Sequence, residues 1–130
     1  MLDKVEYWLE LCDDDLKAAK AMLKSENFLW AGFICHLIVE KALKAAIAKI
    51  TNEVPPKTHD LPRLADKTDI CDGLSNDHKN LLNKLTPLQI EARYPEYKEK
   101  ITSLLTEKYC ADLLEETEEF LCWIKGKLKR

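Results

Sequence analysis

The sequence predicts an all-α fold, an up-and-down helical bundle of four main helices and one short helix. Apolar residues recur with the 3.6-residue period of a helix along most of the chain, and the two-residue alternation of a strand is nearly absent. Only three glycines interrupt this pattern. With 130 residues and an apolar fraction of 46%, the chain is long enough to bury one core. We therefore expect a single domain over residues 1–130.

Composition restricts the class of protein. Charged residues make up 33% of the chain and the formal net charge is -3, which argues against a protein that binds nucleic acid by charge alone. No apolar run approaches the length of about 18 residues that a membrane span needs. The first fifteen residues are acidic, unlike a signal or transit peptide. The five cysteines are widely spaced and form no C-x-x-C motif, which favours reduced thiols in a cytoplasmic protein and no metal site.

The first expected helix runs from about Asp3 to Lys24. Three consecutive aspartates, residues 13–15, cannot share one helix face, so we interpret them as a solvated edge rather than a metal site. The apolar stripe of this helix consists of Val5, Trp8, Leu9, Cys12, Leu16, Ala19 and Leu23.

The second expected helix runs from about Phe28 to Ile50 and is apolar nearly all round. Such a helix belongs at the centre of a bundle. It ends before TNEVPPKTHDLPRL, where Pro55 and Pro56 force an extended connection. Its small residues, which permit close approach by neighbours, are Ala31, Gly32, Ala42, Ala45 and Ala46.

Capping signals place the next two helices. A short helix is expected from Leu61, with Asp60 as its N-cap and Pro62 in its first turn. Ser75 is expected to cap the helix that follows, and Pro87 should end or kink that helix.

The remaining chain holds one irregular segment and one long helix. The segment IEARYPEYKEK, residues 90–100, is expected to be irregular because Pro95 holds Tyr94 out of helical geometry. The last helix is expected over residues 106–125, with Gly126 as its stop. One face of this helix is acidic and carries Glu115, Glu116, Glu118 and Glu119.

A polar stripe lies inside the apolar second helix. His36, Glu40 and Lys44 are spaced by four residues, so a helix stacks them on one face. A carboxylate and an ammonium among apolar neighbours need partners. Taken alone, Glu40 is explained by a structural ion pair with Lys44. The alternative is that all three side chains point into a shared cleft.

Two loop segments carry candidate partners for this stripe. His59 follows the double proline, and histidine is the side-chain type whose charge changes near neutral pH. Arg93 can grip a phosphate or carboxylate through two hydrogen bonds. Tyr94 or Tyr97 could stack on a base. Each has an ordinary structural alternative, as a helix cap, an ion-pair partner or a core anchor.

Four segments in order resemble the HEPN superfamily, the domains found beside minimal nucleotidyltransferases in prokaryotes. They are CDDDLKAAKAML, NFLWAGFICHLIVEKALKAAI, the THDL of residues 58–61 and the ARYPEY of residues 92–97, and together they span nearly the whole chain. The resemblance implies a compact all-α bundle, usually a homodimer. It also implies a nucleotidyltransferase partner in a two-component toxin–antitoxin module.

Some members of that superfamily are metal-independent ribonucleases, with an arginine followed a few residues later by a histidine at the dimer cleft. In this chain neither Arg63 nor Arg93 is followed by a histidine at that distance. We therefore assign no catalytic residue. The subgroup with RYP in place of that motif is more similar, and for it the resemblance implies a nucleotide- or partner-binding role.

Three hypotheses follow. The first is a non-catalytic module that dimerises, acts with a nucleotidyltransferase and binds a nucleotide, without cofactor or metal. The second is a metal-independent ribonuclease with an atypical site, in which His59 is the base and Arg93 binds the phosphate. The third is a purely structural role for the polar stripe and loops. The candidate nucleotide-binding residues are His36, Glu40, Lys44, His59, Arg93, Tyr94 and Tyr97.

Overall fold

A computed structural model describes residues 3–51, 54–90 and 95–129, and for residues 89, 90 and 95–98 only the backbone. Over these ranges every regular element is a helix and no strand is present, so the predicted all-α class is confirmed. No helix within them is both long and apolar enough to cross a membrane.

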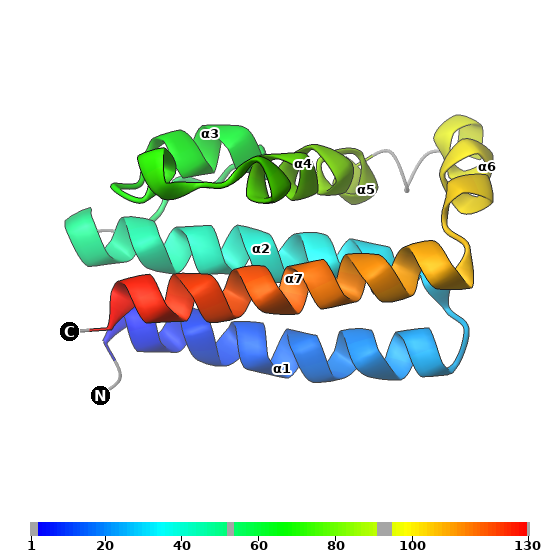
Figure 1. The fold of residues 1–130 in the computed structure, drawn as a ribbon, viewed down its shortest axis with the longest axis horizontal. Helices are drawn as coiled ribbons and strands as arrows, with labels where there is room; N and C mark the ends of the chain where they lie inside the picture. Colours follow the sequence, from blue (N-terminus) through cyan, green and yellow to red (C-terminus); the bar gives the residue numbers. More distant parts are fainter. Residues whose placement is uncertain (1–2, 52–53, 91–94, 130) are drawn as a thin grey trace.

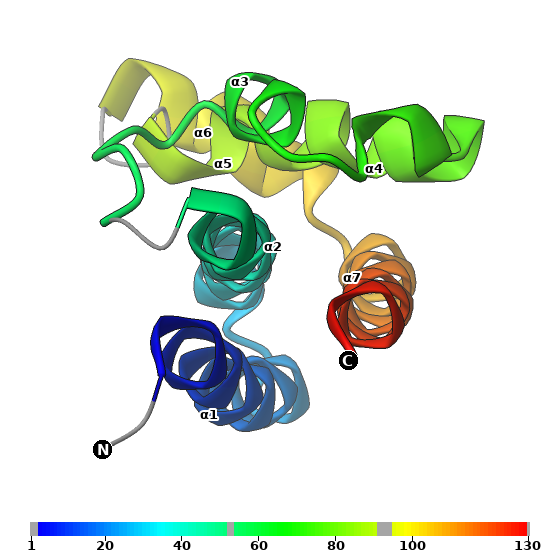
Figure 2. The same cartoon turned by 90° about the vertical axis from the view of Figure 1, so that its left-hand side faces the viewer.

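Three long helices run side by side. They are α1 (Lys4–Lys24), α2 (Phe28–Thr51) and α7 (Glu107–Leu128). Figure 1 shows that α1 and α2 run in opposite directions, that α7 runs parallel to α2, and that both termini lie at the same end of the bundle. Seen along these helices in Figure 2, α2 lies between α1 and a layer formed by α3 (Leu61–Asp66), α4 (Asn76–Leu85) and α5 (Pro87–Ile90).

The predicted central position of α2 is confirmed. It packs against α1 and α7 and also against α3, α4 and α5. Its small residues let neighbours approach closely. A Cβ atom added at Gly32 would lie 3.2 Å from Leu88 Cδ1, so the close packing there depends on the missing side chain. The aliphatic residues of α2 with 0% exposure are Ile38, Val39, Ala42, Leu43, Ala45 and Ala46.

The N-caps of α3 and α4 are the residues that the sequence predicted. The carboxylate of Asp60 accepts a hydrogen bond from the Arg63 backbone N–H and begins α3 (Leu61–Asp66). Ser75 and His78 form a reciprocal capping box at the start of α4 (Asn76–Leu85). After Thr86 the chain continues as the four-residue helix α5 (Pro87–Ile90), so Pro87 starts a new helix where the previous one ends.

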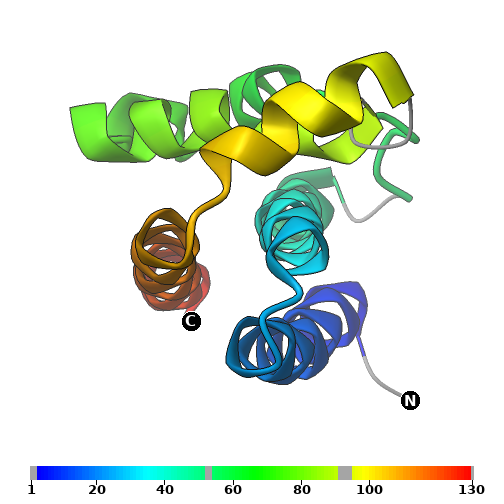
Figure 3. The same cartoon turned by 90° about the vertical axis from the view of Figure 1, so that its right-hand side faces the viewer.

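Two expectations were wrong. Of the segment 90–100 expected to be irregular, residues 95–100 belong to α6 (Pro95–Leu104), because proline is well tolerated in the first turn of a helix and restricts only the residue before it, whereas residues 91–94 lie outside the described residues. Helix α7 also continues through Gly126 to Leu128, a residue that is only 7% exposed. Burial of that leucine offsets the cost of about 1 kcal/mol for glycine inside a helix. Figure 3 shows the end of α6 leading into the start of α7.

Candidate functional site

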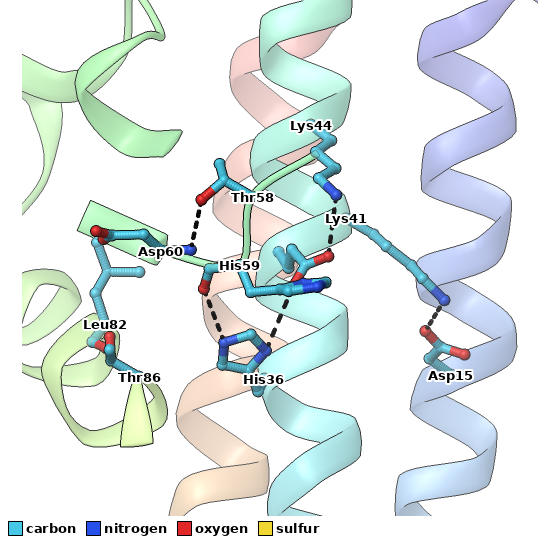
Figure 4. Close-up of polar contacts among 10 residues, drawn as sticks. Asp15, His36, Lys41, Lys44, Thr58, His59, Asp60, Leu82 and Thr86 are labelled. Carbon is cyan, nitrogen blue, oxygen red and sulfur yellow. Dashed lines mark hydrogen bonds and ion pairs between the residues drawn. The ribbon is translucent and has the colours of Figure 1, made fainter. Parts of the chain in front are cut away.

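The polar stripe lies in the middle of α2. His36, Glu40 and Lys44 are 0%, 4% and 9% exposed, so all three are buried as the sequence suggested. Opposite them lies the segment before α3, which folds back over α2 and carries His59 (Figure 4). Pro55 and Pro56 lie in this segment and hold the residues before them in an extended conformation.

The Glu40 carboxylate is paired through both oxygens. Its Oε1 accepts a hydrogen bond from His59 Nδ1 at 2.7 Å, and its Oε2 accepts one from Lys44 Nζ at 3.1 Å. A buried carboxylate is stable only when it is paired and hydrogen-bonded in this way. Glu40 therefore joins α2 to the loop that precedes α3.

His36 holds the backbone of the same loop. Its Nε2 lies 3.2 Å from the carbonyl oxygen of His59, and because a carbonyl only accepts, Nε2 carries the hydrogen. Its Nδ1 lies 3.6 Å from Glu40 Oε1 and has no hydrogen-bond partner. Burial lowers the pKa of His36 to about 4, although the nearby Glu40 carboxylate opposes this shift. At neutral pH His36 is thus an uncharged imidazole.

The second ring nitrogen of His59 is not used by Glu40. Its side chain is 50% exposed, and its Nδ1 donates to Glu40, so Nε2 carries the lone pair of the neutral ring. That nitrogen accepts a proton or a hydrogen bond from a ligand, and after protonation it donates to an anion. The loop is therefore fixed twice, through the His59 backbone and through its ring.

An aromatic residue that the sequence placed in the α1 stripe also reaches the cluster. Lys44 Nζ lies 5.7 Å from the ring centroid of Trp8, a cation–π contact. Trp8 in turn contacts Tyr7 edge to face, with ring centroids 5.8 Å apart. The sequence has no signal for this contact, because it depends on how α1 and α2 align.

Neighbouring charges are paired elsewhere. Lys41, on α2, donates to Asp15 of α1 at 2.6 Å (Figure 4). Lys125 of α7 is paired with Asp13. Two of the three consecutive aspartates thus join helices instead of only facing solvent. Within the described residues, no group of three or more His, Cys, Asp or Glu side chains is arranged to hold a metal ion.

The structure brings together four of the seven candidate residues, namely His36, Glu40, Lys44 and His59. Arg93 and Tyr94 lie outside the described residues. Of Tyr97 only the backbone is described, and it lies in α6. Their roles in a ligand site remain predictions.

The sequence matches a known protein family over nearly its whole length. The family model described as HEPN domain matches residues 5–127. The chain belongs to the HEPN domain family. No curated protein matches this HEPN domain.

Two solved structures share the fold of this HEPN domain. One is TT1696 from Thermus thermophilus, with a TM-score of 0.73, 21% identity, and coverage of 98% of this chain and 100% of that one. The other is ST0689, described as an archaeal HEPN homologue, with a TM-score of 0.70, 21% identity, and coverage of 99% and 100%. At this identity the likeness concerns the fold alone.

Proposed function

We propose that this HEPN domain is a non-catalytic interaction module that forms a homodimer, acts with a nucleotidyltransferase partner in a toxin–antitoxin-type system, and binds a nucleotide. The observation that supports nucleotide binding is the cluster of Glu40, Lys44 and His59. The imidazole of His59 is held by a buried carboxylate at 2.7 Å, and yet half of its side chain is exposed. Family membership supports the partner class.

The contacts divide the cluster into two roles. His36 and Glu40 are used internally, because their polar atoms face the loop and each other. The half-exposed His59 ring is the group that a ligand phosphate meets, and the largely buried Lys44 ammonium adds positive charge beside it. With His59 protonated, two positive charges adjoin one carboxylate, and the cluster attracts an anion.

Calorimetric titration with ATP and GTP tests nucleotide binding. Heat is expected with the native protein, and His59→Ala should abolish most of it. Lys108→Ala is the control, because Lys108 has an 87% exposed side chain and lies on α7. A native protein that gives no heat with either nucleotide contradicts this part of the proposal.

The partner and the dimer need separate tests. Co-purification from native cells should recover a small nucleotidyltransferase, and sedimentation equilibrium should give twice the mass of 15.0 kDa. A monomer at every concentration tested, or recovery of the chain alone, would remove the corresponding claim without affecting the other.

A metal-independent ribonuclease is the second candidate. It is favoured by the Glu40–His59 pair, because a carboxylate that orients an imidazole is the arrangement used for general base catalysis. Incubation with RNA in the presence of a chelator should then give cleavage that His59→Ala removes. Intact RNA with concentrated native protein rejects this candidate.

A further inference from the structure

One side of the central helix has no helical neighbour. Helix α2 packs against α1, against α7 and against the layer of α3, α4 and α5. On the side of α2 opposite α7, Figure 2 and Figure 3 show no described helix against it, and only the loop before α3 runs along part of this side. A helix that is apolar nearly all round, and so belongs in an interior, is therefore left open along one side.

A row of residues marks this open side of α2. Trp30, Phe33 and Leu37 follow one another at intervals of three and four residues, and Lys41 and Lys44 continue the row. Residues at this spacing share one helix face. Lys44 lies between α1 and the loop, because it contacts a ring of α1 and the carboxylate that binds the loop. The apolar half of the row is open, since Trp30 is 57% exposed and Phe33 and Leu37 are only partly buried.

Helix α1 extends this apolar surface. Leu11, Ala18 and Met22 are partly buried and share one face of α1 with Asp15, which binds Lys41 of the row on α2. Together the apolar residues of the two helices form one surface, which we call the open face. It consists of Leu11, Ala18, Met22, Trp30, Phe33 and Leu37. Apolar surface that spans two helices and stays open to solvent is typical of a site of association.

Charges of opposite sign flank the apolar row of α2. Glu26 is exposed in the turn before α2, and Lys41 follows the row, each about two helical turns from the middle of residues 30–37. In a two-fold dimer a surface meets itself, so an axis through that middle brings Glu26 of each copy to Lys41 of the other. The Lys41 ammonium already binds Asp15 at 2.6 Å, but with three donors it can bind a second carboxylate. The occupant that matches both ends at once is a second copy of this chain.

We propose that the open face is the surface through which two copies of this chain pair, with their α2 helices antiparallel about an axis near Phe33. This inference rests on the proposed homodimer and adds its interface. The same axis places the turn between α1 and α2 of one copy beside the half of α2 that carries Lys41 and Lys44 in the other. The cluster that contains His59 therefore lies at the edge of the interface, where the second copy contributes the Glu26 carboxylate.

Sedimentation equilibrium of the full chain tests the open face. Native protein should give twice the mass of 15.0 kDa. Trp30→Glu should weaken the dimer by about a hundredfold, because association would bury a carboxylate that has no partner. Ile50→Glu is the matched control, since Ile50 is 46% exposed on the same helix and lies off the row. It should dimerise like native protein, and urea unfolding identifies any variant with a destabilised fold.

Chemical cross-linking tests the pairing without a change to the open face. A carbodiimide joins a carboxylate to a contacting amine. When native protein is mixed with an isotopically labelled copy, peptides that join Glu26 of one copy to Lys41 of the other should therefore form. Glu26→Gln, which removes the carboxylate and keeps the size of the side chain, should abolish this product.

The outcomes separate this interface from the dimer itself. If native protein is a monomer at every concentration, the homodimer and the open-face interface are both rejected. If native protein dimerises but folded Trp30→Glu dimerises equally well, or Ile50→Glu weakens the dimer as much, the interface lies elsewhere and the dimer stands. Cross-linked dimers in which Glu26 and Lys41 are never joined between copies would likewise reject the proposed pairing.

Discussion

At the scale of single residues, His36 is the most constrained group of the cluster. It is fully buried, donates from Nε2 to the His59 carbonyl and stays uncharged at neutral pH. Its pKa in the folded protein is about 4, compared with an ordinary 6.5. Between these values the unfolded chain binds more protons than the folded one.

The free energy of unfolding should therefore decrease as the pH falls from 6.5 towards 4. His36 contributes its full stabilisation above its ordinary pKa and loses it progressively below, by about 3 kcal/mol in total. Urea denaturation across this range measures the slope. A His36→Asn variant should show a shallower slope, and equal slopes for both proteins would contradict the assignment.

Glu40 and Lys44 give a second prediction at this scale. Replacing Glu40 by leucine leaves a buried ammonium and one ring nitrogen without their acceptor, which should destabilise the fold by about 3 kcal/mol. Replacing Lys44 by methionine at the same time should recover a large part of that loss, because no unpaired charge remains. A double-mutant cycle measures the coupling, and strictly additive effects would show that the pair is not coupled.

At the scale of the elements, the start of a helix could be predicted where a nearby side chain accepts a hydrogen bond from one of its first backbone N–H groups. The N-caps Asp60 and Ser75 could be predicted from sequence because a side-chain oxygen accepts a hydrogen bond within the next turn. Gly126 misled the prediction of the α7 terminus, because the stop signal is local whereas burial of Leu128 depends on tertiary packing. Pro95 was interpreted as a break in structure, whereas it begins α6, since proline can begin a helix as well as interrupt one.

Two helical glycines should respond differently to alanine. Gly126 has no atom within 4 Å of an added Cβ, so Gly126→Ala should stabilise the protein by about 0.5–1 kcal/mol. Gly32→Ala should gain less or lose stability, because the new methyl group would meet Leu88 at 3.2 Å. Thermal denaturation of the two variants compares them, and a larger gain at Gly32 would refute the packing argument.

At the scale of the whole molecule, the site is made by the way that helices and loop align. The stripe in α2 could be predicted from its spacing, and His59 could be proposed as its partner from its place in the loop after the double proline. Trp8 could not, because its contact with Lys44 is set by the register of α1 against α2. The ion pair between Asp15 and Lys41 depends on the same register.

This register also gives a prediction. Asp15→Asn removes the partner of Lys41 at a partly exposed interface, and a loss of about 0.5 kcal/mol is expected because such pairs are screened by solvent. The loss should shrink in high salt. Urea denaturation at low and high salt measures both, and a salt-independent loss would point to packing instead of charge.

The three histidines differ sharply in access to solvent. His36 and His78 are 0% and 9% exposed, whereas half of the His59 side chain is open and its Nε2 is unengaged by Glu40. A histidine-selective acylating reagent such as diethyl pyrocarbonate should therefore label the native protein at one position. Peptide mass mapping would find that single adduct at His59, and a saturating ligand of the cluster would protect it.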